Sequence, residues 1–218
     1  MSSTATADAT VGRFGSGHSV RRIEDPTLVS GTGKYVDDVS IAGQLHVVLL
    51  RSPYPHARIA SIDASAARAM PGVVAVYTGE DLKAGGVKVM PTPSPFPRPD
   101  GKPSVSAPMW PLAVGTVRYV GEAVAAIVAE TRDAARDARD AVTVEYEDLP
   151  SVVTIDAALA AGAPLVCPEA GDNWVSQARH GDAAKAADAF AKAAHVVSLD
   201  LVNQRLAAVA MEPRGILA

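Results

Sequence analysis

The order strand, helix, strand occurs twice in this sequence, in residues 58–78 and again in residues 119–147, and it constrains the fold more than any other feature. In each stretch, a segment of strand length precedes an alanine-rich segment, and a segment that alternates between apolar and polar residues follows. A two-residue period suits a strand with one buried face, whereas alanine-rich segments favour helices. We therefore expect an α+β fold in which helices pack on a mixed sheet.

The ends of these segments carry residues that are typical of helix boundaries. Asp63 begins the first helix, which is expected to stop before Pro71, and Thr131 begins the second helix. Two earlier segments add to the sheet. The apolar run 45–50 predicts a buried strand, and residues 31–38 predict a turn followed by a short strand.

The run 119–128 is strongly apolar and is predicted to be a buried strand. Gly121 and Glu122 interrupt it, and we expect them at a bend because glycine relieves a backbone constraint. Ile127 is expected in the core.

Between residues 83 and 111 the sequence changes character, since this range contains eight prolines and three glycines. Proline fixes the backbone angle φ and cannot donate to a strand ladder, so we predict a long loop on the surface or over another domain. Loops of this length usually have a function or are disordered.

The sequence predicts four regions along the chain. Residues 1–20 are small and polar and predict a disordered arm, while residues 21–150 hold the strands and helices of the main domain. Residues 151–180 have the composition of a linker. Residues 181–218 are expected to begin a second domain, with a helix over 183–194 and an alternating strand over 196–202.

Composition excludes several classes of function. The formal net charge is −4 and no basic stripe is present, so nucleic acid is not an expected partner. No apolar stretch reaches the roughly 18 residues that a membrane helix needs, and the arm does not resemble a signal peptide. With one cysteine no internal disulfide can form. We expect a soluble, cytoplasmic protein.

Chemical motifs are sparse, and no catalytic, cofactor-binding or metal-ligating residue is assigned. The five histidines share no ligand spacing. His46 is expected to pack within a strand, and His56 to be exposed or to cap a turn. Cys167 has no neighbouring His or Lys to activate it, so we interpret it as an apolar filler. The cluster Gly12-x-x-Gly15-x-Gly17 lacks a flanking strand and helix, and no nucleophile elbow favours a hydrolase.

Taken in order, the segments resemble the α/β-hammerhead domain of the xanthine oxidase and aldehyde oxidase family, most closely its aerobic carbon monoxide dehydrogenase-like branch. The resemblance covers about residues 21–215. The matching pieces are Arg22-Ile-Glu-Asp-Pro, Gly31-Thr-Gly-Lys-Tyr-Val-Asp-Asp, Leu45-His, Arg51-Ser-Pro-Tyr-Pro-His-Ala-Arg, Pro71-Gly-Val, Val117-Arg-Tyr-Val-Gly-Glu-Ala-Val-Ala, Val144-Glu-Tyr-Glu-Asp-Leu-Pro, Gly181-Asp, Asn203-x-Arg and Met211-Glu-Pro-Arg-Gly.

Departures from the family pattern are small. Ala123 stands where proline often follows Gly-Glu, and Ala207 and Val209 replace prolines that often precede Met-Glu-Pro. They leave the fold intact and the substrate branch undecided.

The resemblance implies that this chain is the amino-terminal part of the large subunit of a molybdenum hydroxylase. In that family the subunit continues into molybdopterin-binding domains, and residues 181–218 would be the start of the first. The complete enzyme is expected to use molybdopterin cytosine dinucleotide, with iron-sulfur clusters and FAD in partner subunits. The cofactor loops and the glutamate base belong to those later domains, so no cofactor is expected in this chain, and Glu122 and Glu212 are only distant candidates.

Two functions are therefore weighed. In the first, the chain supports the cofactor domains of an oxidoreductase of the xanthine dehydrogenase and carbon monoxide dehydrogenase type, takes part in subunit assembly, and is inactive alone. Its partners would be the remainder of the molybdenum subunit, an iron-sulfur subunit and an FAD subunit. In the second, the chain is a stand-alone, non-catalytic scaffold or protein-interaction module with the same fold.

Overall fold

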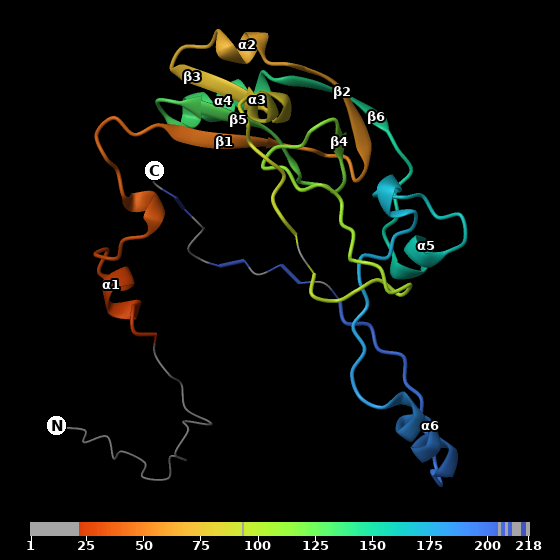
Figure 1. Cartoon of the computed structure of the whole chain (residues 1–218). Helices are drawn as coiled ribbons and strands as arrows, with labels where there is room; N and C mark the ends of the chain where they lie inside the picture. The colour runs from red at the N-terminus through yellow and green to blue at the C-terminus, as the bar shows by residue number, and fades with distance from the viewer. Residues whose placement is uncertain (1–21, 93, 205, 208, 211–214, 217–218) are drawn as a thin grey trace, which may run out of the picture. The chain divides into compact units, whose positions relative to one another are not determined.

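The computed structural model describes residues 22–92, 94–204, 206–207, 209–210 and 215–216 (Figure 1). The described residues divide into two compact units: Gly43–Asp200 is one, and the described residues before Gly43 and after Asp200 form the other. The predicted arm, the Gly12 cluster and Glu212 lie outside the described residues.

Six strands in the larger unit form two separate three-stranded sheets, with orders β1-β5-β3 and β4-β2-β6. All the pairings within these two sheets are antiparallel. The α+β class is thus confirmed, but the single mixed sheet that we expected is two antiparallel ones. The strands are β1 (His46–Arg51), β2 (Ala57–Asp63), β3 (Val73–Thr78), β4 (Thr116–Val117), β5 (Ala123–Ala129) and β6 (Thr143–Asp148).

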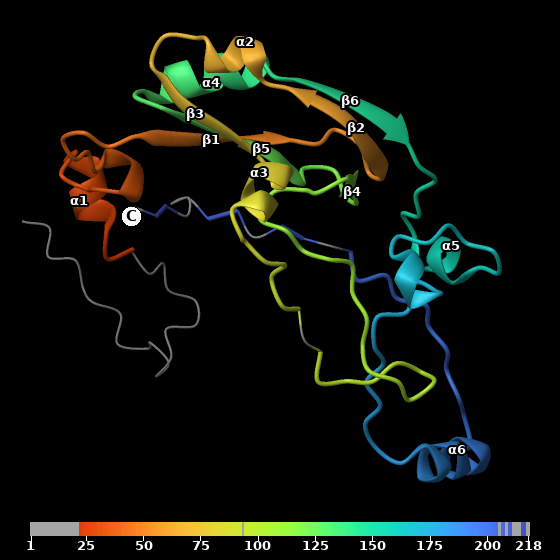
Figure 2. The same ribbon diagram turned by 45° about the horizontal axis from the view of Figure 1, so that its top comes forward.

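Each strand–helix–strand stretch leads from one sheet to the other, which explains why no parallel pair results. Helix α2 (Ser65–Arg68) joins β2 to β3, and helix α4 (Arg132–Asp140) joins β5 to β6. The two stretches run alongside each other, since β2 pairs with β6 and β3 pairs with β5. Figure 2 shows α2 and α4 together on one side of the sheet β1-β5-β3.

The core of this unit lies between that sheet and α4. Ile127 of β5 is fully buried and stands in register with Val48 of β1 and Val76 of β3. Ala135 and Ala138 of α4 are fully buried in the same cluster, because alanine lets a helix approach the sheet closely. The prediction that Ile127 belongs to the core is confirmed.

The predicted cap of α4 is confirmed, whereas the one predicted for the first helix is wrong, because Asp63 ends β2 and Ala64 is the N-cap of α2, without a side-chain cap bond. The hydroxyl of Thr131 accepts from the backbone N–H of Ala134 at the start of α4. In α3 (Gly79–Ala84), Thr78 and Asp81 exchange hydrogen bonds as a capping box.

The bend at Gly121 is confirmed, and it includes more residues than the sequence indicated. Residues 119–122 form a turn instead of the first part of a strand, and Gly121 has a φ of +91°, which side chains with a Cβ rarely adopt. Strand β5 therefore begins at Ala123.

Residues 31–38 were expected to include a short strand, and that expectation is wrong. They contain a 3₁₀ turn, η1 (Val36–Asp38), closed by the backbone N–H of Tyr35, which donates to the Asp38 carboxylate at 2.9 Å. A local side-chain bond of this kind competes with strand pairing. Helix α1 (Asp25–Val29) precedes it, with a proline at its first turn, and was not predicted.

The described residues after β6 contain three short elements: α5 (Ile155–Leu159), the 3₁₀ turn η2 (Pro168–Ala170) and α6 (Ala183–Lys192). The side chain of Asp182 caps α6 by accepting the backbone N–H of Lys185. The predicted strand over 196–202 is wrong, because that segment is irregular and has no ladder partner among the described residues. Alternation alone does not make a strand without a neighbour to bond.

Between α3 and β4 the proline-rich range holds no helix or strand in its described residues, apart from a single bridge between Met90 and Met109. This agrees with the predicted loop. Within the described part of the chain, no helix is long and apolar enough to cross a membrane.

Candidate functional site

Two of the motifs quoted above fold into one feature at the start of β5. The backbone N–H of Ser52 donates to the carbonyl of Glu122, and the N–H of Gly121 donates back to the carbonyl of Ser52, both at 2.8 Å. The Arg51 guanidinium adds a bond of 2.8 Å to the carbonyl of Gly121. The segments 51–58 and 117–125 thus form one folded feature.

Glu122, a distant catalytic candidate, lies inside this feature. It is 7% exposed, and its carboxylate accepts the backbone N–H of Arg118 at 2.5 Å. A carboxylate bonded to a backbone donor four residues away fixes the turn between β4 and β5. The contact observed for Glu122 therefore stabilises the fold. Glu212, the other candidate, lies outside the described residues.

A third motif joins at His56. The ring Nδ1 of His56 lies 2.7 Å from the carbonyl of Pro150, so Nδ1 carries the proton in this bond, and the N–H of Leu149 donates to the carbonyl of His56. The rings of Tyr54 and Tyr146 pack against each other with centroids 4.8 Å apart. The expectation that His56 is exposed is wrong, since it is only 8% exposed. His46 lies in β1, as expected.

A cavity of about 390 Å³ opens between this junction and the segment that follows α5. Its lining includes His56 and Pro150, Arg118 directly after β4, and Leu165 and Glu169. The guanidinium of Arg118 donates from Nη1 to a backbone carbonyl at 3.3 Å, while its Nε is buried without a hydrogen-bond partner among the described residues.

Cys167 neighbours this cavity, and its surroundings disfavour a nucleophilic role. Its thiol donates to the Glu169 carboxylate at 3.2 Å. Burial, followed by the Glu169 hydrogen bond and its negative charge, raises the pKa of the Cys167 thiol above the ordinary value of 9.0. A raised pKa lowers the fraction of thiolate, the reactive form.

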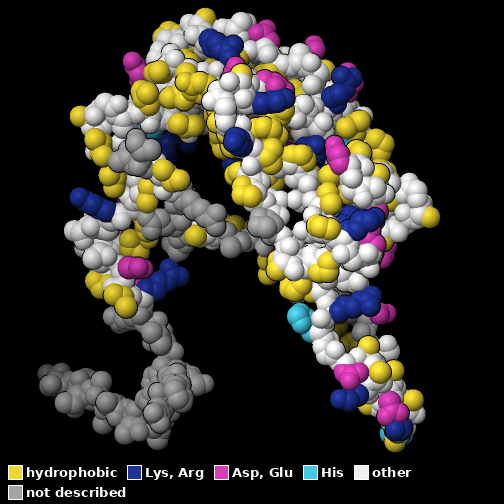
Figure 3. All heavy atoms as spheres, in the orientation of Figure 1, with side chains coloured by type: hydrophobic (Ala, Val, Ile, Leu, Met, Phe, Trp, Pro, Cys, Tyr) yellow, Lys and Arg dark blue, Asp and Glu magenta, His cyan; other side chains and the backbone are white. Residues whose placement is uncertain are grey.

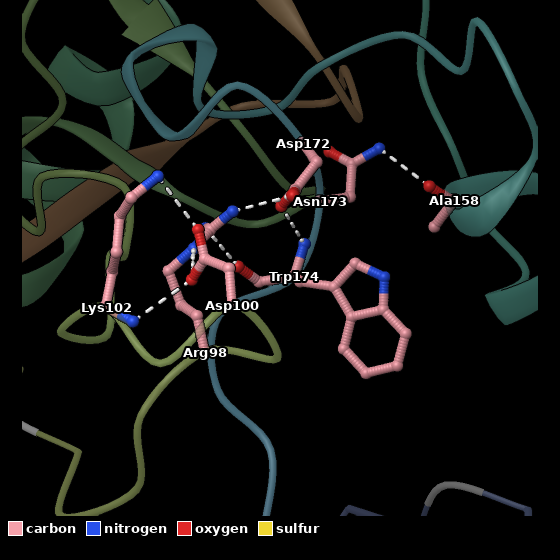
Figure 4. A network of polar contacts seen from close by, with 7 residues as sticks. All are labelled: Arg98, Asp100, Lys102, Ala158, Asp172, Asn173 and Trp174. Atoms are coloured by element: carbon pink, nitrogen blue, oxygen red, sulfur yellow. Dashed lines mark hydrogen bonds and ion pairs between the residues drawn. The ribbon is translucent and has the colours of Figure 1, made fainter.

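A second polar cluster anchors the proline-rich loop, as Figure 4 shows. The side chain of Arg98 is 6% exposed and donates to the Asp172 carboxylate and to the carbonyl of Trp174, each at 2.6 Å. Asp100 lies 3.9 Å from Arg98 and 2.9 Å from Lys102. The sequence analysis missed Arg98, although it is the only charged residue in the proline-rich stretch 91–99.

The described residues do not fit the molybdenum cofactor that the resemblance implies. They contain no group of three or more His, Cys, Asp or Glu placed to hold a metal ion. In the cavity the positive charge of Arg118 is matched by the carboxylate of Glu169, which does not suit the phosphates of a dinucleotide. We therefore assign no step of a reaction to these residues.

Sequence comparisons with known proteins point to one family. Residues 30–150 match the family described as aldehyde oxidase and xanthine dehydrogenase, a/b hammerhead domain. The chain is 41% identical over 206 residues to the nicotine 6-hydroxylase large subunit of Paenarthrobacter nicotinovorans, which covers 93% of this chain and 24% of that protein. It is 41% identical over 152 residues to the carbon monoxide dehydrogenase large chain of Afipia carboxidovorans, covering 70% and 17%.

Solved structures agree with these relatives. A Cu,Mo carbon monoxide dehydrogenase superposes with a TM-score of 0.64 at 36% identity, covering 81% of this chain and 22% of that chain. Quinoline 2-oxidoreductase from Pseudomonas putida 86 gives 0.53 at 42% identity, covering 67% and 18%. The chain spans a quarter or less of the length of these proteins, and it matches the amino-terminal part of molybdenum hydroxylase large subunits. It therefore belongs to the aldehyde oxidase and xanthine dehydrogenase family, with its a/b hammerhead domain in residues 30–150.

Proposed function

We propose that this chain supports the cofactor domains of a molybdenum hydroxylase large subunit and takes part in subunit assembly, without catalysing a reaction itself. One observation carries the proposal: polar groups of three shared motifs are bonded to one another within the domain. Ser52 and Glu122 join two motifs, and His56 joins a third through Pro150. Groups that are committed to internal hydrogen bonds hold a fold and are not free for substrate.

The complete enzyme, in this proposal, hydroxylates a carbon centre with oxygen from water or oxidises carbon monoxide. It uses molybdopterin cytosine dinucleotide, which supplies the oxidising centre, and passes electrons to iron-sulfur and FAD subunits in the cytoplasm. Support comes from relatives that are named as large subunits or chains, one of them a large molybdopterin subunit. The ranges 151–180 and 181–218 would then be the linker and the start of the first molybdopterin-binding domain.

A chimera tests this role. This chain would replace the matching amino-terminal region of the Paenarthrobacter nicotinovorans nicotine 6-hydroxylase large subunit, to which 93% of it aligns. We expect a soluble chimera that takes up molybdenum like the unaltered parent subunit. A matched chimera with Gly121→Val should fail to fold and should therefore take up no molybdenum, because a β-branched residue is strained at a φ of +91°.

The proposal is wrong if the wild-type chimera folds but takes up no molybdenum. A chain that retains its fold without supporting the cofactor domains would favour the stand-alone scaffold.

A further inference from the structure

Three cavities follow one another along the segment after α5. The cavity beside Arg118 shares Leu165 with a second of about 400 Å³, and the second shares Asn173 and Trp174 with a third of about 150 Å³. We call the residues of 158–175 that line these cavities the connector surface. Figure 3 shows hydrophobic side chains beside charged ones over this part of the molecule.

The connector surface is held in place although it contains little regular structure. The side-chain amide of Asn173 donates to the carbonyls of Ala158 and Pro164, each at 3.0 Å, and its oxygen accepts the N–H of Val166 at 3.2 Å. On its other side, Arg98 binds the same segment through Asp172. A single asparagine that closes three backbone bonds makes this segment a preformed surface.

The connector surface exposes large apolar side chains, and its charges are nearly balanced. Leu159, Trp174 and Val175 are exposed by 46%, 36% and 48%. The charge of Asp172 is matched by Arg98, and Glu169 and Arg118 leave one charge of each sign. Aromatic and aliphatic side chains with few open charges are typical of the centre of a protein interface.

Arg118, which lines the first cavity opposite the connector surface, has one donor that lacks an acceptor in the described part of the chain. The Nε–H of Arg118 is buried, and no described residue accepts it. A buried donor without a partner is costly, so the site favours an occupant toward which the guanidinium can turn to present this N–H to a neutral acceptor. Because Glu169 stands in the same cavity, an anion is disfavoured and a backbone carbonyl suits the site.

We propose that the connector surface is a permanent interface, covered by the polypeptide that follows the corresponding region in large subunits, and that a backbone carbonyl of that polypeptide accepts from Arg118. The inference rests on the proposed function. It is supported by length, since the chain spans 24% of the nicotine 6-hydroxylase large subunit, and the rest of such a subunit is available as the occupant.

The surface suits this occupant better than two others. Separate subunits that associate reversibly meet through more polar patches, whereas permanent interfaces resemble a domain core cut in half. A small ligand fills one pocket, while here three cavities share their walls along one segment.

Cys167 provides a built-in reporter, because it lines the third cavity and is the only cysteine of the chain. We would alkylate the isolated chain and the chimera described above with N-ethylmaleimide at one pH and follow the peptide that contains Cys167 by mass spectrometry. The thiol should react roughly tenfold or more slowly in the chimera, since an interface must open before the reagent enters.

Arg118→Met tests the donor. In the chimera it should raise the alkylation rate by about tenfold, the effect of losing one hydrogen bond to a charged group. In the isolated chain it should change the midpoint of urea unfolding only slightly, because the Nε has no partner among the described residues and the bond from Nη1 to the Thr116 carbonyl is long, at 3.3 Å. Arg136→Met, on the exposed face of α4, is the matched control and should change neither measurement.

The outcomes separate this inference from the proposed function. A chimera that takes up molybdenum while Cys167 reacts at the rate of the isolated chain overturns the interface and leaves the proposed function standing. Protection that appears only after iron-sulfur or FAD subunits are added assigns the surface to a partner subunit and also overturns the inference. A folded chimera without molybdenum and without protection overturns both.

Discussion

The backbone N–H of Ser52 donates to the carbonyl of Glu122 at 2.8 Å, and through this bond two segments about 70 residues apart form one feature. Ser52 is 2% exposed, so the bond is shielded from water. It fixes the turn that precedes β5, and β5 is the central strand of its sheet. The stability of the domain should therefore depend on β5 and the contacts around it.

Replacing Ile127 by Ala should lower the free energy of unfolding by about 2–5 kcal/mol, because the side chain is fully buried and leaves a cavity. Val47→Ala on the neighbouring strand is the control, since Val47 is 61% exposed. Urea denaturation measures both. Equal effects of the two substitutions would contradict the placement of Ile127 in the core.

Arg98→Met should loosen the proline-rich loop, because it removes the partner of Asp172 and the donor to the Trp174 carbonyl. We expect a loss of about 1–3 kcal/mol, moderated by water around the partly exposed Asp172. Hydrogen exchange should rise in residues 97–102 and 172–177. If it rises equally across the sheets, the effect is global and the anchor role of Arg98 is wrong.

Acid should weaken α3 through Asp81. The backbone N–H of Thr78, and then its hydroxyl, hold the pKa of the Asp81 carboxyl below the ordinary 3.8. A lowered folded-state pKa contributes stability above the unfolded-state pKa, and this is lost as the pH falls through the folded value.

Asp81→Asn should therefore reduce the loss of stability below about pH 4. At neutral pH it should cost about 0.5 kcal/mol, a small value because the carboxylate is half exposed. Urea denaturation at several pH values measures this, with Asp133→Asn on the surface of α4 as the control. A pH profile identical to that of the wild type would contradict the role of Asp81.

Residues 171–218 should be less stable than residues 30–150. Helix α6 has no buried residues, and Val197 of the irregular segment after it is 91% exposed, whereas β5 is mostly buried. Amides of α6 should exchange much faster than those of β5, since few contacts must break for them to open. Equal protection of both regions in a monomer would show that this prediction is wrong.

The purified chain should contain no stoichiometric molybdenum and show no hydroxylase activity, because the family resemblance places the cofactor loops in later domains of the large subunit. Metal analysis by mass spectrometry, with the parent large subunit as the positive control, measures this. Tightly bound molybdopterin in the chain alone would contradict the supporting role.

The sequence by itself determined which segments become strands and helices wherever the signal is local. Alternation predicted β3 and β6, and capping predicted α4, because a two-residue period and an N-cap hydroxyl act within a few residues. The ordered family motifs also identified the hammerhead domain, which the family match over residues 30–150 confirms.

Only the tertiary structure decided how these segments combine. Whether β2 and β3 share a sheet depends on which strands bond across long separations, and the helices turned out to join two sheets. The strand expected over 196–202 failed for the same reason, since alternation supplies a face but no ladder partner. The tertiary structure also decided the roles of Arg98 and Arg118, because the burial and bonding of an arginine depend on residues distant in sequence.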